Sequence, residues 1–349
     1  MGTFARSALI ISLAAALLGG CGALPLSSSK GQGDVQLPIG APGAMPQGRA
    51  IATSADRGGS WMLPEAKNQD LVYVANWYPT NTVTVYSYAS QKLVGTLTGF
   101  AYPSGLCTDK AGNVFVVNED GNQGGRNILE YRHGGTKAIK HLPDADGAVA
   151  CSIDSTTGNL AVANAGYYGS CSGSLYVYKN ARGTPAKYTD GYDICAFFSS
   201  VYDDKGNLFV GGDNDAYYPQ FGFAELPKGG GALANISLSR QLANSDGSLG
   251  WDGSHVTLSS SGYNNRIYRL TIKGRRAYSR QFTSLAGGVP VDEYWFQSSR
   301  RRQILIGADN GPDNDVLYWN YPAGGLPIVV IKDGVNHPDG VTVSVAAKP

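Results

Sequence analysis

Five aspartates hold equivalent places in the sequence, and their side chains could share one metal ion. Each stands just before an apolar, strand-like run: Asp146, Asp193, Asp246, Asp292 and Asp339. Carboxylates that converge in this way supply the oxygen ligands preferred by Ca²⁺ and other divalent cations. Crowding of like charges would also raise the pKa of one member. The alternative is that these residues, three of which precede glycine, only form the tight turn into each strand.

Aromatic residues gather at a second set of equivalent places, close to the asparagines that end strand-like runs. The set comprises Trp77, Tyr78, Tyr167, Tyr168, Tyr217, Tyr218 and Tyr263. Exposed Tyr and Trp bind sugars or peptides by stacking combined with hydrogen bonding. Tyrosine is abundant throughout this chain, so packing inside the fold is the alternative role for some of these rings.

The elements that must position both sets are repeated hairpins. The run Gly112–Asn118 (GNVFVVN) recurs as GNLAVAN ending at Asn164 and GNLFVGGDN ending at Asn214, and weaker copies end at Asn76, Asn264 and Asn310. Six units spaced 42 to 50 residues apart are typical of a β-propeller. We therefore predict an all-β, six-bladed propeller with four antiparallel strands per blade. In that fold the five aspartates and the aromatic set share one face, the loop face around the central channel.

The two ends of the repeat array predict how the ring closes. The run LVYVAN at 71–76 has no first strand before it, and GVTVSV at 340–345 has no second strand after it. Pairing these runs would complete one blade and remove two exposed sheet edges. We expect the C-terminal strand to join the N-terminal blade.

Composition agrees with this architecture and limits the partners. The chain has 47 Gly and 21 Tyr, and only 16% of its residues are charged, as suits short strands joined by tight turns. Its formal net charge of +1 provides no overall field for polyanions, so nucleic acid is not expected as a partner. Residues 61–349 are expected to form one domain and to be monomeric.

The N-terminus predicts export. Arg6 precedes an apolar stretch from Ala8 to Leu18, which is too short for a membrane-spanning helix of about 20 residues. The following Leu18-Gly19-Gly20-Cys21 resembles the lipobox of bacterial lipoproteins, which implies a signal peptide over 1–20, lipidation of Cys21 and anchoring to the outer membrane or cell surface. Residues 21–60 are rich in Gly, Pro and Ser and are interpreted as a flexible tether. An ordinary secretory peptide is the alternative.

Two segments resemble the blade pattern of the NHL, SMP-30/gluconolactonase and virginiamycin-B-lyase supergroup of six-bladed propellers. They are Pro103–Asp109 followed by Gly112-Asn113, and Pro338–Val343. The resemblance implies the fold more strongly than a function, because this fold hosts hydrolases, lyases and binding modules. In the lactonase branch it implies a metal site of which only Asp339, within Pro338-Asp339-Gly340, is matched here.

Four cysteines beyond Cys21 suit an exported domain. The blade positions favour disulfides between Cys107 and Cys151 and between Cys171 and Cys195, each joining adjacent blades. Free buried thiols are the alternative.

Two functions follow from these features. The first is a non-catalytic binding module that presents its loop face to an envelope protein, peptide or saccharide, with no cofactor except a Ca²⁺ or other divalent ion. The second is a metal-dependent lactonase, hydrolase or lyase that uses the carboxylate ring. The incomplete metal set favours binding over catalysis.

Overall fold

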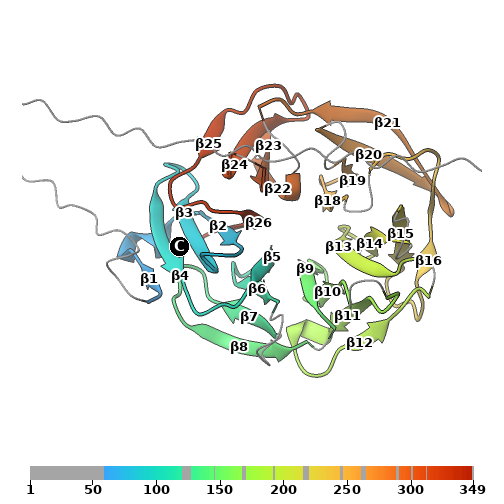
Figure 1. Ribbon diagram of the computed structural model, residues 1–349, viewed down its shortest axis with the longest axis horizontal. Coiled ribbons are helices and arrows are strands. Elements are labelled where there is room, and N and C mark those ends of the chain that lie inside the picture. The colour runs from blue at the N-terminus through green and yellow to red at the C-terminus, as the bar shows by residue number, and fades with distance from the viewer. Residues whose placement is uncertain are drawn as a thin grey trace, which may run out of the picture. The chain divides into compact units, whose positions relative to one another are not determined.

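The computed structural model describes residues 59–119, 127–144, 146–166, 170–191, 193–214, 220–243, 247–260, 265–287, 291–299, 302–311 and 313–347. Within these ranges the chain forms six sheets, antiparallel except for one short outer strand, arranged around a central channel, which confirms the six-bladed β-propeller (Figure 1). None of the helices in these ranges is long and apolar enough to cross a bilayer. The predicted signal peptide, Cys21 and all of the predicted tether except Gly59 and Ser60 lie outside the described residues.

Each blade is a sheet whose innermost strand lines the channel. From the channel outward, blade one contains β26 (Pro338–Ser344), β2 (Leu71–Asn76), β3 (Thr82–Ser87), β4 (Leu93–Leu97) and β1 (Trp61–Met62). Blade two contains β5 (Pro103–Thr108), β6 (Val114–Asn118), β7 (Asn127–Tyr131) and β8 (Ala138–Pro143). Blade three contains β9 (Ala148–Ile153), β10 (Leu160–Asn164), β11 (Ser174–Tyr178) and β12 (Ala186–Tyr188).

The second half of the ring repeats this order. Blade four contains β13 (Ala196–Tyr202), β14 (Leu208–Asp213), β15 (Phe221–Leu226) and β16 (Ala234–Asn235). Blade five contains β18 (Leu249–Trp251), β19 (Val256–Ser259), β20 (Arg266–Lys273), β21 (Arg276–Ser284) and β17 (Ser237–Leu238). Blade six contains β22 (Val291–Ser299), β23 (Arg302–Asp309), β24 (Asp315–Tyr321) and β25 (Val329–Ile331). Two short 3-10 helices, η2 (Pro64–Asn68) and η3 (Lys179–Ala181), lie between strands.

The C-terminal strand closes the ring as the sequence predicts. Strand β26 pairs antiparallel with β2, so Leu71 lies opposite Ser344 and Val74 lies opposite Val341. All six residues of β2 are buried, because both faces of its sheet are covered by neighbouring blades. One apolar cluster joins Val72 and Val74 of blade one to Ile304 and Ile306 of blade six.

Aspartates fix the turns between first and second strands. In blade two, Asp109 Oδ1 accepts the backbone N–H groups of Ala111 and Asn113, and in blade four Asp203 Oδ1 accepts those of Lys205 and Asn207. An Asp side chain that bonds the backbone two residues on stabilises a tight turn. This local chemistry accounts for the D…GN pattern that made the repeats visible.

The outer strand of blade four is unusually short. Strand β16 ends at Asn235, and the chain then crosses to blade five. There β17 pairs in parallel with β21, with Ser237 opposite Arg276. Ile236 lies between the two short strands and is buried in an apolar cluster with residues of blades four and five, which stabilises the crossing.

Candidate functional site

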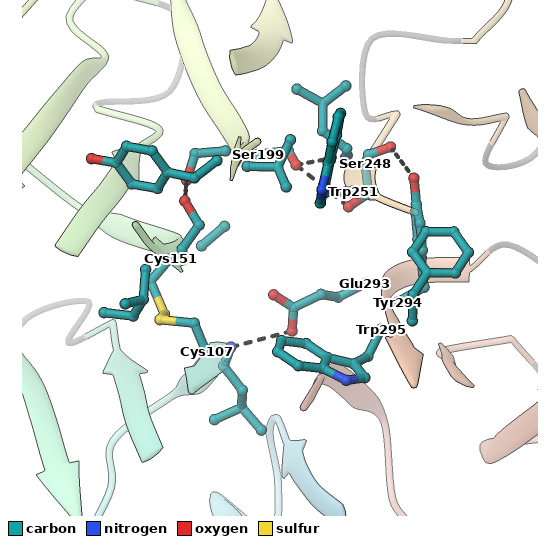
Figure 2. Close-up of a pocket in the computed structure, with 18 of the residues that line it drawn as sticks. Cys107, Cys151, Ser199, Ser248, Trp251, Glu293, Tyr294 and Trp295 are labelled. Carbon is teal, nitrogen blue, oxygen red and sulfur yellow. Dashed lines mark hydrogen bonds between the residues drawn. A yellow bond between two sulfur atoms is a disulfide. The ribbon is translucent and has the colours of Figure 1, made fainter. Parts of the chain in front are cut away.

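A cavity of about 330 Å³ lies in the channel between the first strands of the blades. Its wall contains residues of β5, β9, β13, β18, β22 and β26 (Figure 2). The cavity extends past the strand ends to Ser155 and Asp204. Those two residues follow the C-terminal ends of β9 and β13. The described cavity therefore reaches toward the face of the first-to-second-strand turns, whereas the sequence predicts a ligand at the opposite, loop face.

The carboxylate of Glu293 points into this cavity from β22 (Figure 2). Its Oε2 accepts the backbone N–H of Leu106 from blade two at 3.2 Å and that of Val341 from blade one at 2.8 Å. Its Oε1 has no hydrogen-bond partner within the described part of the chain. One carboxylate oxygen is thus held by two blades, and the other is free to meet a ligand.

β-bulges bring these three groups together. The pairing register shifts between Pro103 and Leu106 in β5, between Val291 and Tyr294 in β22, and opposite Ala75 and Asn76 of β2, where Asp339 is the extra residue. A bulge adds residues to one strand and re-aims the neighbouring side chains and N–H groups. Leu106, Glu293 and Val341 lie at or beside these bulges.

Gly340 permits the close approach of the strands at this point. A Cβ atom there would lie 2.2 Å from the backbone oxygen of Ser104 and 2.7 Å from Glu293 Oε2. Gly105 is similarly confined, because its Cβ would lie 2.5 Å from Ala150 Cα. The glycine of the Pro338-Asp339-Gly340 motif therefore has a packing role beside the carboxylate.

The cavity is acidic and aromatic in character. Its described wall contains the carboxylates of Asp203, Asp204 and Glu293, several serine and threonine hydroxyls, and the rings of Trp251 and Trp295, but no Lys, Arg or His. Burial raises the pKa of Glu293 well above its ordinary value, although the two backbone N–H groups act in the opposite direction. A cation placed near Oε1 would favour the ionised form of this carboxylate.

The predicted aspartates lie elsewhere. The carboxylate of Asp146 accepts hydrogen bonds from Ser174 of β11 and Lys187 of β12, and that of Asp193 accepts one from Asn235 of β16. Both side chains are thus bonded to outer strands of their own blades, and neither lines the cavity. Asp246 and the side chain of Asp292 lie outside the described residues.

Asp339 remains beside the channel, at the start of β26. Its side chain is partly buried, and burial together with the nearby charge of Glu119 raises its pKa to about 6. Among the described residues, no group of three or more His, Cys, Asp or Glu side chains could hold a metal ion. Divalent-ion binding stays a prediction from the sequence.

The raised pKa of Asp339 predicts how stability varies with pH. Because the folded state holds this proton more tightly than the unfolded chain, the free energy of unfolding should fall as pH rises from about 4 to about 6 and stay lower above that. A shift of about two pKa units corresponds to about 3 kcal/mol, and partial exposure reduces the expected effect to about 1–2 kcal/mol. Denaturant titrations of wild type and Asp339→Asn between pH 4 and 7.5 would measure it.

Asp190 provides the comparison for that experiment. Burial and the charge of Asp193 raise its pKa to about 6 as well, so Asp190→Asn should remove a separate part of the same decline. If the free energy of unfolding of Asp339→Asn fell with pH as steeply as that of wild type, the raised pKa assigned to Asp339 would be wrong.

Two of the predicted aromatics, Trp77 and Tyr78, can be located. Trp77 is 41% exposed and Tyr78 is 59% exposed, and the Trp77 ring lies 5.8 Å from that of Tyr102. They form an exposed aromatic pair at the end of β2. Tyr167, Tyr168, Tyr217, Tyr218 and Tyr263 lie outside the described residues.

The four cysteines form two disulfides. Cys107 of blade two is joined to Cys151 of blade three, and this bond lies in the cavity wall (Figure 2). Cys171, in the loop before β11, is joined to Cys195, at the entry to blade four. Three consecutive blades are thus linked covalently.

The sequence pattern points to Asp292 and does not single out its neighbour Glu293. A signal was present, because Glu293 is the only acidic residue within the otherwise apolar and polar run EYWFQS. A charge inside a strand that lines a channel is costly unless it is bonded, and so it marks a candidate site.

Comparison with known proteins supports the fold. No family model and no curated protein matches the chain. A solved structure of a functionally unknown protein from Desulfotomaculum acetoxidans is similar, with a TM-score of 0.54 and 12% identity over 83% of this chain and 89% of that one. A protein of unknown function from Bacteroides caccae has a TM-score of 0.56 and 11% identity, over 79% and 99%. The β-propeller domain of Cps50 (Swd1) from Myceliophteria thermophila has a TM-score of 0.50 and 8% identity, over 80% and 87%.

Proposed function

We propose that this protein is a non-catalytic binding module, held at the cell envelope by a lipid on Cys21, which binds a small amine in its central channel. The proposal includes membership of the NHL/SMP-30-like supergroup, on the strength of the Pro103–Asp109 and Pro338–Val343 patterns. The observation that carries it is Glu293, whose Oε2 is fixed by two backbone N–H groups while its Oε1 faces a cavity.

The chemistry of the cavity supports an amine as the ligand. A carboxylate without a protein cation nearby is complementary to an ammonium group, and charge-assisted hydrogen bonds are the stronger ones. The rings of Trp251 and Trp295 in the same wall suit the alkyl part of the ligand and can attract its charge. A lysine side chain of a peptide and a free aliphatic amine share this chemistry.

The orientation of the aspartates favours binding over metal-dependent catalysis. The alternative enzyme requires a ring of carboxylates at the channel mouth. Asp146 and Asp193 instead bond to outer strands of their own blades, which leaves Asp339 as the described member of that set beside the channel.

Titration with n-butylamine, using tryptophan fluorescence as the readout, would test the proposal. We expect a saturable change, because two tryptophans line the cavity, and much weaker binding of n-butanol, which has a similar size but no charge. Replacing Glu293 by Gln should weaken butylamine binding about 10-fold or more, as is typical of a hydrogen bond to a charged group. Affinity should rise with pH as Glu293 ionises, since burial raises its pKa.

Glu65→Gln is the matched control, because Glu65 is an exposed glutamate on η2, away from the cavity wall. This variant should bind butylamine as wild type does. Equal affinity for butylamine and butanol, or undiminished binding by a folded Glu293→Gln variant, would show that the amine assignment is wrong.

A further inference from the structure

The β20–β21 hairpin of blade five is the most basic segment of the chain. Residues 253–291 contain Arg266, Arg269, Lys273, Arg275, Arg276 and Arg280, and no Asp or Glu. The remainder of the chain has 22 Lys and Arg against 27 Asp and Glu. A net charge near zero therefore conceals a local charge of +6.

Most of these cations are available to a partner. Lys273, Arg275 and Arg276 form the exposed tip of the hairpin, and Arg280 is exposed farther along β21. None of these four forms an ion pair with any residue in the described ranges, whereas Arg269 is paired with Asp252.

Exposed apolar side chains lie toward the other end of the hairpin, beside Arg266. Phe282 of β21 is 45% exposed, and the guanidinium of Arg266 lies 4.2 Å from the centroid of its ring. The turn before β25 packs against the end of β21, where Ala286 N–H donates to Gly325 O at 2.8 Å. The neighbouring Leu326 is 74% exposed and Ile328 is 42% exposed.

We infer that this surface, comprising the β20–β21 hairpin, Leu326 and Ile328, binds the anionic headgroups of a lipid bilayer. Clustered Lys and Arg are attracted to anionic lipids, and adjacent Phe and Leu side chains suit the boundary between headgroups and acyl chains. A purely electrostatic partner, such as an acidic protein, would make no use of the apolar residues. The contact is separate from the channel site and does not depend on the proposed amine ligand.

Vesicle co-sedimentation of the full chain carrying Cys21→Ala would test this surface without the proposed lipid anchor. We expect stronger binding to phosphatidylglycerol vesicles than to phosphatidylcholine vesicles, with the difference decreasing as salt is raised. Binding to the phosphatidylcholine vesicles also measures any insertion of the apolar N-terminal stretch, because such insertion does not require anionic lipid. Each cation contributes about fivefold near an anionic surface. The combined change Lys273→Glu, Arg275→Glu and Arg276→Glu should therefore reduce the phosphatidylglycerol affinity at least about 10-fold.

The matched control is Lys110→Glu, Lys179→Glu and Lys205→Glu, which reverses the same number of exposed charges on turns of three other blades. It should stay within about twofold of the parent chain, provided that circular dichroism shows both variants to be folded. Equal losses in the two variants, or no preference for phosphatidylglycerol, would overturn the inference. The parent chain could instead bind polyglutamate and show no preference for phosphatidylglycerol. If the hairpin variant then lost the binding to polyglutamate, the surface would be assigned to an acidic protein.

Discussion

A chain that ends at His337 should lose several kcal/mol of unfolding free energy and melt about 10 °C below the full-length protein. The truncation removes β26, in which Val341 and Val343 are each only 1% exposed, and full burial of one such side chain contributes about 1.5–3 kcal/mol. It also uncovers the edge of β2, whose six residues are all buried. Such a loss is a large share of the usual 5–15 kcal/mol, and thermal unfolding followed by circular dichroism would measure it.

A chain that ends at Ala346 is the control for this truncation. It keeps all of β26 and the hydrogen bond of 2.9 Å from Ala346 N–H to Asp70 Oδ1. We expect it to melt within about 2 °C of the full-length protein. If the chain ending at His337 also melted within about 2 °C, ring closure would contribute far less stability than the pairing of β26 with β2 implies.

The fold could be predicted because several blades repeat the same local chemistry. The turn between first and second strands needs an Asp to accept backbone N–H groups, and this produced the D…GN pattern at Asp109 and Asp203. The second strands are buried on both faces, so they read as continuous apolar runs such as LVYVAN. Ring closure followed from counting the strands without partners. These features depend only on residues close together in the sequence or on the number of repeats.

The candidate site could not be predicted in the same way, because it depends on departures from regular pairing. Bulges in β5 and β22 and near the start of β26 decide which side chain faces the channel, and a shift of one residue exchanges the two faces. The sequence pattern points to Asp292, whereas the carboxylate that points into the cavity belongs to Glu293, one position later. Asp146 and Asp193 bond to residues of outer strands, Lys187 and Asn235, that lie about 40 positions away.

The net charge of the chain is likewise a poor guide to the charge of one part of its surface. The net charge of +1 predicts that nucleic acid is not a partner, but it does not reveal that six cations lie within the β20–β21 hairpin, whose two strands are adjacent in space. Net charge averages over the whole surface, whereas a partner contacts one part of it. The distribution of charge along the sequence therefore carries information that the total lacks.

Replacing Asp252 by Asn should lower the free energy of unfolding by about 2–3 kcal/mol, because this carboxylate joins blades five and six. Its Oδ2 accepts Arg269 Nε at 2.8 Å and the Tyr321 hydroxyl at 2.9 Å, and its side chain is fully buried. Removing one partner of a buried ion pair leaves the other charge uncompensated. Arg269 is 23% exposed, so water reduces this cost below the value for a fully buried pair.

Asp203→Asn is the matched control, because it makes an equivalent substitution in the turn of blade four. Asp203 bonds Lys205 and Asn207 within its own turn and forms no ion pair with any described residue. We expect a loss of about 1 kcal/mol or less, since asparagine retains one acceptor oxygen. Urea titrations of both variants at pH 7 would give the difference, and equal losses would show that the link between the blades adds no stability.

The losses of unfolding free energy caused by the same two substitutions should become more similar at acidic pH. Burial alone would raise the pKa of Asp252, but hydrogen bonds from Ser254, His255 and Tyr321 outweigh it and lower the pKa below its ordinary value. A lowered pKa means that the stabilising contribution is complete above the unfolded value of about 3.9 and is lost as pH falls through the folded value. The excess loss caused by Asp252→Asn over Asp203→Asn should therefore be largest near neutral pH and should shrink at about pH 3. A difference that stayed constant between pH 7 and pH 3 would indicate packing, and not the charge of Asp252, as the source of the link between blades five and six.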